Sequence, residues 1–368
     1  MTELKNDPTN ERTLDALGTL LLSPRDGESG DKLANLVAYV EQLSPLQFED
    51  LLNQAEKQRV LRRVLDVLKR CSIADKHGCV EIIDSRLTAE KERAQKVMEA
   101  IQRLVYHFDR RACPVLVMKT LDHWPDTGSD IDLLAASEDQ NVCKIFESDL
   151  QAERQVQSWG DRLAHKFNFR LEGLGELVEV HIGCLGQTGE QKKLAAGVLS
   201  RGLKQPYGDG VVPVPTPEDR IIIATLQRMY RHYYIRLTDI VNIYRSLAEQ
   251  RVDVDKLKSI AEASSIWPGV ATLLLIVCQR AAKFGAPPVP LPGFVVREAR
   301  FNSARTYVDQ KFVRVPLLPE AANLFFSQIA DNGRRHEYRA MARLSLLPVL
   351  ATAAFVSFRV TGNDKGIW

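Results

Sequence analysis

The sequence predicts a predominantly helical α+β fold in which a small mixed sheet lies between two helical regions. Three observations predict it: apolar residues recur at helical spacing through residues 1–112, short strand-like runs begin only after Pro114, and helical spacing returns after Pro217. We therefore expect an N-terminal helical region at residues 1–94, an α/β core at 95–214 and a C-terminal helical region at 215–368.

The composition is that of an ordinary globular protein. The 368 residues are 45% apolar and 26% charged, and at roughly 150 residues per domain this length predicts two or three domains. Lys and Arg number 49 against 47 Asp and Glu, which leaves a formal charge of +2. Proteins that bind long nucleic acids usually carry a basic excess or stripe, so we do not expect a nucleic acid partner.

Cysteine usage and the N-terminus both favour a cytoplasmic protein. The six cysteines form no Cys-x-x-Cys pair and no cluster with the spacing of zinc ligands, which is typical of reduced thiols. The first residues are polar and lack the apolar stretch of a secretory signal. We therefore expect a cytoplasmic location.

The N-terminal region carries one marked helix start. Thr88 precedes a long helical run through residues 97–108, and a Thr side chain can accept a hydrogen bond from the first turn of a helix. Glu90 and Glu92 would then lie in that turn, where the helix dipole favours negative charge. The sequence thus predicts that a long helix begins at Thr88.

The strand candidates follow Pro114. Short apolar runs bounded by turn residues predict strands. We expect strands at residues 115–118, 131–135, 166–171, 177–182 and 211–214, with a helix over residues 141–158. Because these runs are short and helices interrupt them, the sheet should be small and mixed.

The C-terminal region is helical again. Helical spacing predicts helices at residues 221–230, 235–247, 254–263 and 270–284. Residues 344–358 are mostly apolar, but they are too few for a membrane span of about twenty residues and they contain Pro348. We expect a buried C-terminal helix there, and a membrane-surface helix is the alternative.

Gly128-Ser129-Asp130-Ile131-Asp132 is the most informative motif. Side chains two residues apart on a strand share one face, with Cα atoms about 6.6 Å apart, so Asp130 and Asp132 can hold divalent cations jointly. Mg²⁺ prefers hard oxygen ligands and is often bound by one or two carboxylates together with substrate phosphates. The motif therefore indicates a metal site, and an exposed strand start is the simpler alternative.

This segment resembles the polymerase-β-like nucleotidyltransferase superfamily, whose members have a Gly-Ser helix start, a short spacer and then Asp-x-Asp between apolar residues. Here Lys119 and Thr120 stand at the Gly-Ser position, with nine residues between Thr120 and Asp130. The chain is similar in this to a less-studied branch with Leu-Lys-Gly at that point, with Thr120 in place of the Gly. The resemblance implies Mg²⁺ or Mn²⁺ at Asp130 and Asp132. It also implies nucleotide-binding residues around them, namely Lys119, Thr120, Gly128 and Ser129.

A third carboxylate comes from the strand predicted at residues 177–182. Its alternation places Glu179 and His181 on one face, and if this strand pairs beside residues 131–135, Glu179 lies about 5 Å from Asp132. The same branch has a carboxylate-x-His strand at this stage of the chain. The resemblance therefore implies that Glu179 is the third catalytic and metal-binding carboxylate. His181 would then assist at the nucleotide, and a structural histidine is the alternative.

A second block similar to that branch spans residues 215–239. A Pro-rich start with Glu218 and Asp219 leads into a helix, and Arg231 and Arg236 follow among several tyrosines. Such a patch could hold a triphosphate and stack a base. The resemblance thus implies nucleotide binding by Arg231 and Arg236, and a solvated helix face is the alternative.

Together these expectations describe an enzyme that transfers a nucleoside monophosphate from an NTP to an unidentified hydroxyl acceptor and releases pyrophosphate. A small-molecule acceptor is expected over nucleic acid because the net charge is close to zero. Two alternatives stay open. A catalytically degenerate binding module is favoured by the missing Gly-Ser turn. An Asp-x-Asp glycosyltransferase is disfavoured because no alternation of strands and helices precedes the motif.

Overall fold

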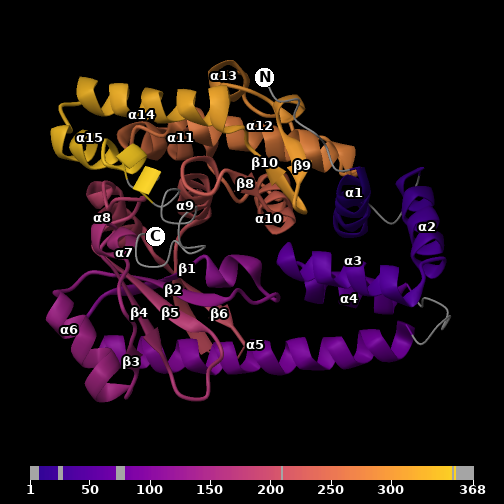
Figure 1. Ribbon diagram of the computed structural model, residues 1–368, viewed down its shortest axis with the longest axis horizontal. Coiled ribbons are helices and arrows are strands. Elements are labelled where there is room, and N and C mark those ends of the chain that lie inside the picture. Colours follow the sequence, from indigo (N-terminus) through magenta and orange to yellow (C-terminus); the bar gives the residue numbers. More distant parts are fainter. Residues whose placement is uncertain (1–7, 24–27, 72–78, 209, 350–351, 354–368) are drawn as a thin grey trace.

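The computed structural model describes residues 8–23, 28–71, 79–208, 210–349 and 352–353. Most of this part is helical, and a five-stranded sheet lies between the long helix α5 (Cys79–Arg110) and helices of the C-terminal region (Figure 1). The predicted class, predominantly helical α+β with a small mixed sheet, is confirmed.

The described residues before Pro114 form a series of helices. These are α1 (Pro8–Leu22), α2 (Glu28–Glu41), α3 (Pro45–Lys57), α4 (Leu61–Arg70) and α5. Helix α3 begins at Pro45 because Ser44 and Gln47 form a capping box: the Ser44 side chain accepts from the Gln47 backbone N–H, and the Gln47 side chain accepts from the Ser44 backbone N–H at 2.9 Å.

The predicted helix start at Thr88 is wrong. Thr88 lies inside α5, and its Oγ1 donates to the carbonyl of Asp84 at 2.9 Å. A Thr within a helix can satisfy its hydroxyl in this way without ending the helix. Buried Ile83 continues the apolar stripe of α5 towards its start, so Glu90 and Glu92 lie in mid-helix and not in a first turn.

Four of the predicted strands lie in the five-stranded sheet. Its order is β1-β2-β5-β4-β3. The strands are β1 (Val115–Met118), β2 (Asp130–Ala135), β3 (Glu153–Arg154), β4 (Lys166–Arg170) and β5 (Leu177–Ile182). β2 and β5 are parallel, and the other pairs are antiparallel, so the sheet is mixed as predicted.

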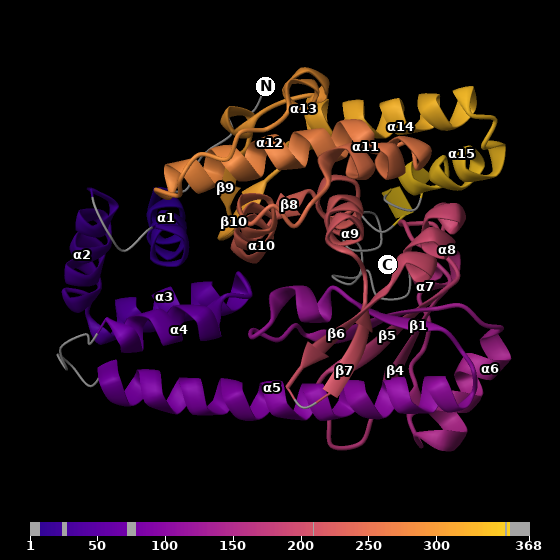
Figure 2. The same cartoon turned by 180° about the vertical axis from the view of Figure 1, so that it is seen from behind.

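Alternation along β2 and β5 separates an apolar face from a polar one. Ile131, Leu133 and Val180 are fully buried in the cluster that includes the apolar stripe of α5, which crosses the sheet (Figure 2). The intervening side chains point to the opposite face. That face lies towards α8 (Lys192–Arg201) and α9 (Pro217–Met229).

The helix predicted over residues 141–158 is wrong in its second half. α6 (Asp139–Lys144) continues into the wider turn η2 (Ile145–Asp149), and the chain then leaves the helix at Gln151, whose φ is 51°. A left-handed residue cannot continue a right-handed helix. The residues that follow instead pair with β4 as the edge strand β3.

The fifth predicted strand belongs to a second sheet. It is β7 (Gly210–Val214), which pairs with β6 (Leu203–Tyr207) in a two-stranded ribbon. Two short elements complete this part of the chain: η1 (Thr120–His123) joins β1 to β2, and α7 (Trp159–Leu163) precedes β4.

The four helices predicted after Pro217 are all present, and further elements follow them. α9 begins after Thr216, whose side chain accepts a hydrogen bond from the Asp219 backbone N–H. The remaining elements are β8 (Tyr234–Ile235), α10 (Leu237–Ala248), α11 (Val254–Ala263), α12 (Trp267–Lys283), α13 (Gly293–Glu298), η3 (Ser303–Arg305), β9 (Tyr307–Asp309), β10 (Phe312–Arg314), η4 (Leu317–Ala321), α14 (Ala322–Arg334) and α15 (Tyr338–Leu344).

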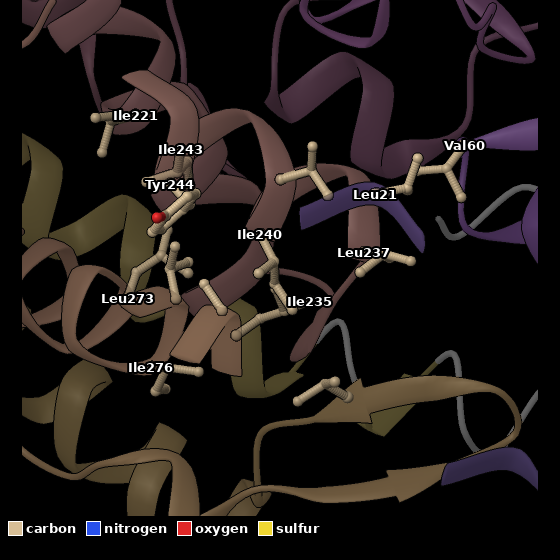
Figure 3. Close-up of a cluster of buried hydrophobic side chains, with 14 of the residues drawn as sticks. Leu21, Val60, Ile221, Ile235, Leu237, Ile240, Ile243, Tyr244, Leu273 and Ile276 are labelled. Atoms are coloured by element: carbon tan, nitrogen blue, oxygen red, sulfur yellow. The ribbon is translucent and has the colours of Figure 1, made fainter. Parts of the chain in front are cut away.

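The N-terminal helices share an apolar core with the C-terminal ones. Leu21 and Val60 belong to the same buried cluster as Leu237 and Ile240 of α10 (Figure 3). The Leu237 backbone N–H donates to the side chain of Gln58 at 2.6 Å. α5 also runs without a break through residue 94, and the division of the chain at residues 94 and 214 stays a prediction.

No helix among the described residues is both long and apolar enough to cross a membrane. α15 ends at Leu344, which is buried. Of residues 344–358, eight are described, and only Leu344 and Leu347 among them are buried. The expected burial is therefore wrong for most of the described residues, and over residues 350–351 and 354–358 it stays a prediction.

Candidate active site

Two carboxylates meet on the sheet face opposite α5. In the parallel pairing of β2 with β5, Asp132 is the register partner of Glu179. His181 lies two residues further along β5 and therefore on the same face. The alternation that predicted Glu179 beside Asp132 is confirmed.

Asp132, Glu179 and His181 form a compact cluster of potential metal ligands. Each offers one ligand atom, and these atoms all lie within 4.8 Å of one another. His181 Nε2 lies 2.8 Å from Glu179 Oε1, whereas buried Nδ1 has no hydrogen-bond partner in the part of the chain described. Burial lowers the pKa of His181 to about 4, so its imidazole is neutral at pH 7, as metal binding requires. The donor set therefore fits a divalent cation.

Two lysines balance the charge of these carboxylates. Lys119 forms an ion pair with Asp132, and its Nζ lies 3.6 Å from Glu179 Oε1. Lys166 Nζ lies 2.6 Å from Glu179 Oε2 and 3.2 Å from Asp161 Oδ1, and its side chain is only 3% exposed. A buried ammonium group is stable only with such partners. The cluster is thus surrounded by positive charge, which suits an anionic ligand.

The two central carboxylates differ in acidity. Burial disfavours ionisation of Glu179, but Lys119 and His181 outweigh it and hold the pKa of Glu179 well below its usual value. Burial raises the pKa of Asp132 well above its usual value, and Lys119 opposes this shift without overcoming it. The surroundings therefore favour the ionised form of Glu179 more strongly than that of Asp132.

Asp130 lies at the start of β2, outside the three-residue cluster. It is half-buried, and Ser129 Oγ donates to its Oδ1 at 2.7 Å. Burial and Lys119 act most strongly on the pKa of Asp132, and the charge of Asp130 comes next and raises it. Asp130 thus influences the cluster without supplying one of its clustered ligand atoms.

The turn that carries Lys119 is tied directly to β2. Thr120 is buried, and its Oγ1 accepts a hydrogen bond from the Asp132 backbone N–H at 2.9 Å. Lys119 has a φ of 53°, a left-handed conformation that is costly for a residue with a Cβ atom. This strained turn carries the ammonium group onto Asp132.

Gly128 and Ser129 lie around Asp130. The carbonyl of Gly128 accepts a hydrogen bond from Arg93 Nη2 at 2.7 Å, while Ser129 donates to Asp130. Gly128 and Ser129 therefore lie just before the first residue of β2, whereas Lys119 and Thr120 contact Asp132 further along the strand.

Two small hollows open beside Lys119. One of about 70 Å³ is lined by Lys119, Asp122 and Arg220, among others. The other, of about 40 Å³, is lined by Lys119, His181 and Arg231, among others. Arg231 therefore shares a hollow with two residues of the site.

Arg236 lies apart from Arg231. Its guanidinium lies over the ring of Tyr234, 5.5 Å from the centroid, and donates to Tyr234 Oη at 3.1 Å. Burial and Arg236 lower the pKa of Arg59, and the charge of Asp130 raises it. The two arginines expected to act together thus approach the site differently: Arg231 lines the hollow of His181, and Arg236 lies near Arg59 and Asp130.

Several charged residues of the site carry no obvious signal in the sequence. Lys166 of the neighbouring strand β4 binds both Glu179 and Asp161, and Asp161 lies in the short helix α7 before that strand. Asp122 lies 3.2 Å from Arg220, and burial raises the pKa of Asp122 to about 6. The one signal for Lys166 is its place at the start of an alternating strand, opposite His181 in the register.

Comparison with known proteins identifies one family. The model of a family described as uncharacterised nucleotidyltransferase matches residues 44–281, which is well over half of the chain. The match includes the sheet, both hollows beside Lys119 and the helices from α3 to most of α12. No curated protein and no solved structure matches the chain.

Proposed function

The chain belongs to the uncharacterised nucleotidyltransferase family, and we propose that it transfers a nucleoside monophosphate from an NTP to a hydroxyl acceptor. The observation that carries this proposal is the pairing of Asp132 with Glu179 in one strand register, with two lysines against them. Carboxylates that can hold a cation, next to ammonium groups that can meet phosphates, are what phosphoryl transfer requires.

Asp132 and Glu179 are the proposed metal ligands, with Asp130 at the rim and His181 within reach. Mg²⁺ or Mn²⁺ bound there would neutralise charge on the phosphates and lower the pKa of an attacking hydroxyl. The low pKa of Glu179 suits it to hold a cation and to orient the hydroxyl, because it stays ionised even in mild acid. We therefore assign Asp130, Asp132 and Glu179 as the catalytic carboxylates.

Lys119 is the proposed phosphate contact. It lines both hollows beside the carboxylates, and the left-handed turn aims its ammonium group at them. Arg231 can reach the same ligand from the hollow that it shares with His181. Thr120 acts by holding β2 in place, and Gly128, Ser129 and Arg236 flank the nucleotide on the Asp130 side.

In the reaction, the acceptor oxygen forms a bond to the α-phosphorus while the bond to pyrophosphate breaks. The acceptor hydroxyl releases its proton to solvent water, and the leaving pyrophosphate takes the electron pair of the broken P–O bond and with it the negative charge. Lys119 and Arg231 stabilise that negative charge. Positioning of this kind, with fixed charges aimed at the phosphates, supplies most of the rate in such transfers.

A binding module without turnover is the second candidate. Lys119 pairs with Asp132 and so occupies one of the positions that a cation would take. The glycosyltransferase alternative has no comparable support. The described residues before β1 form helices and turns, without the alternation of strands and helices that the alternative needs.

Titration calorimetry with α,β-methylene-ATP, which cannot be cleaved at the α-phosphate, tests the proposal. Wild type should bind this analogue only with Mg²⁺ or Mn²⁺, and Asp132→Asn should lose about 100-fold or more in affinity. Asp149→Asn is the matched control because Asp149 pairs with Arg111 outside the site. Metal-independent binding, or an Asp132→Asn variant that equals the control, would contradict the metal assignment. Binding of ATP without pyrophosphate release on any acceptor would favour the binding module.

A further inference from the structure

An apolar groove of about 670 Å³ lies between the residues that follow α9, the elements η4 and α14, and the residues that follow α15. Its lining is mostly apolar and comes from four separate segments: Gln187, Arg231, His232, Tyr233, Leu317, Leu318, Ala321, Ala322, Phe325, Phe326, Leu347 and Pro348. The volume lies within the range of roughly 300–1,000 Å³ that small-molecule sites occupy.

The groove exposes large apolar side chains that a folded chain normally covers. Leu318 is 80% exposed, Phe326 65% and Leu317 63%. They come from two consecutive elements, η4 and α14, and all three line the same groove. Contiguous exposed apolar side chains around a concavity mark a binding site.

The groove continues into the candidate active site. Gln187 and Arg231 line both the groove and the 40 Å³ hollow, which Lys119 and His181 also line. A ligand in the groove can therefore extend past Arg231 towards the carboxylates of β2 and β5.

Arg231 is the charged boundary between the two spaces. It is half-buried, and within the described residues it makes no ion pair or hydrogen bond. A half-buried guanidinium that lacks an anion in the fold can receive one from a ligand. Apolar contacts would thus hold one end of the ligand, and Arg231 would face the phosphates at the other.

We propose that this groove binds the apolar body of the acceptor, so that the acceptor is an amphipathic small molecule whose hydroxyl reaches the carboxylates. The inference rests on the nucleotidyl transfer proposed above and names the class of its acceptor. A protein partner fits less well, because a stable protein interface buries about 800 Å² on each side and would not need a path to Lys119.

A series of n-alkyl β-D-glucosides with four to ten chain carbons provides the test, used below the concentrations at which they form micelles. Their binding to the full chain is followed by displacement of 1-anilinonaphthalene-8-sulfonate, and nucleotidyl transfer by release of pyrophosphate from ATP with Mg²⁺. Because each methylene buried from water favours binding, affinity should rise about fourfold per added carbon.

Two variants locate the binding. Phe326→Asp and Leu318→Asp place a charge in the groove from two different elements, and both side chains are largely exposed, so the fold should survive. Each should abolish the dependence on chain length. Val156→Asp is the matched control, since Val156 is 94% exposed and lies next to β3, away from the groove. Circular dichroism and the melting temperature verify that all three variants are folded.

The outcomes separate this inference from the proposed function. The inference is overturned if glucoside affinity does not change with the length of the alkyl chain. It is also overturned if the two groove variants bind the glucosides as the control Val156→Asp does. Failure of the full chain to bind 1-anilinonaphthalene-8-sulfonate would show that the groove is closed, and it also overturns the inference. So does light scattering that shows a dimer for wild type and a monomer for the groove variants, because the groove is then the contact between two copies. Chain-length-dependent binding without any pyrophosphate release supports the groove as an apolar ligand site and contradicts nucleotidyl transfer. Pyrophosphate release that is unaffected by alkyl chain length and by both groove variants supports nucleotidyl transfer and contradicts the groove as the acceptor site.

Discussion

At the scale of the single residue, Lys119 has one role in the structure and a second role in the proposed function. Its ammonium group neutralises Asp132, and the same group is the proposed contact for the nucleotide phosphates. The partners of Lys119, chiefly Asp132, raise its pKa in spite of burial, so it stays charged at neutral pH. Under the proposed function, a bound cation and Lys119 would compete for one carboxylate, and a nucleotide would remove that competition by giving Lys119 new partners.

Lys119→Met should separate these two roles. Without the competing ammonium group, Mn²⁺ alone should bind severalfold more tightly, as measured by paramagnetic resonance of the free ion. The apparent KM for NTP should rise about tenfold or more, because hydrogen bonds to charged groups contribute roughly 1.5–3 kcal/mol. Lys69→Met, which removes an exposed surface pair with Asp84, is the control. A weaker Mn²⁺ affinity in Lys119→Met would show that the two cations do not compete.

Asp122 makes stability depend on pH. Burial raises its pKa from 3.8 to about 6, so between these values the folded chain binds more protons than the unfolded chain. Stability should therefore fall as pH rises from about 4 through about 6, by about 3 kcal/mol at 1.36 kcal/mol per pKa unit. Asp122→Asn should remove this decline in urea unfolding measured at a series of pH values. Asp149→Asn should retain it, and a slope that is unchanged in Asp122→Asn would locate the effect elsewhere.

Lys166 is the buried cation that holds Glu179 in place. Removing one partner of a buried ion pair usually costs about 3–5 kcal/mol because the other charge is left uncompensated. We expect Lys166→Met to lose stability of this order in urea unfolding, because Glu179 and Asp161 both lose their nearest cation. Lys193→Met removes an exposed pair with Glu337 and should cost less than about 1 kcal/mol. Equal losses in the two variants would argue against a special role of Lys166.

At the scale of the element, the turn between β1 and η1 positions the carboxylate strand. The Thr120 hydroxyl accepts a hydrogen bond from the backbone N–H of Asp132, whose register partners are Met118 of β1 and Glu179 of β5. The turn thus links the strained Lys119 to the strand that carries Asp130 and Asp132. A change at Thr120 should therefore affect both stability and the site.

Thr120→Val tests this link. It keeps the shape but removes the hydroxyl that accepts from the buried N–H of Asp132, and losing an acceptor of this kind costs about 1–3 kcal/mol. Metal-dependent binding of α,β-methylene-ATP should weaken as well, because Asp132 loses its fixed position. Thr120→Ser keeps the hydroxyl and should behave like wild type in both assays. A Thr120→Val variant with full stability would show that this hydrogen bond does not hold the strand.

At the scale of the whole molecule, Arg63 connects the N-terminal helices to the site. From α4 it lies 2.6 Å from Asp126 in the loop before β2, and it donates to Asn242 and Thr238 of α10. Its side chain is 9% exposed, and that of Asp126 is 3% exposed. The N-terminal helices, the sheet and α10 thus meet at a single buried guanidinium.

Arg63→Met should destabilise the whole chain and not one end of it. The loss should be about 3–5 kcal/mol, since Asp126 is left buried without its cation. Urea unfolding followed by circular dichroism and by tryptophan fluorescence should give coincident transitions, as expected if these parts unfold together. Arg70→Met changes an arginine at the end of α4 that bonds only a helix carbonyl in the described structure, and it should have a small effect. Two separated transitions in Arg63→Met would instead indicate independent parts.

The sequence by itself determined the fold class, five of the strands and much of the polar face. Alternation at residues 131–135 and 177–182 placed Asp132 and Glu179 on the same kind of face, because successive side chains of a strand point in opposite directions. The helix start predicted at Thr88 and the second half of the helix predicted over residues 141–158 were wrong for local reasons. A helix accepts an internal Thr, and a single left-handed residue ends a helical pattern that the spacing of apolar residues continues.

Only the tertiary structure decided which charges meet. Arg63 meets Asp126 from a distant segment, and Lys166 meets Glu179 from the neighbouring strand. Nothing in the local sequence distinguishes such a buried ion pair from a surface charge. The same holds for the groove: Arg231 lies far in sequence from η4, α14 and the residues after α15, and it adjoins them only after the C-terminal helices fold back over α9. Periodicity records which face of an element is buried, but it does not record which other element covers that face. That choice depends on packing across the whole chain.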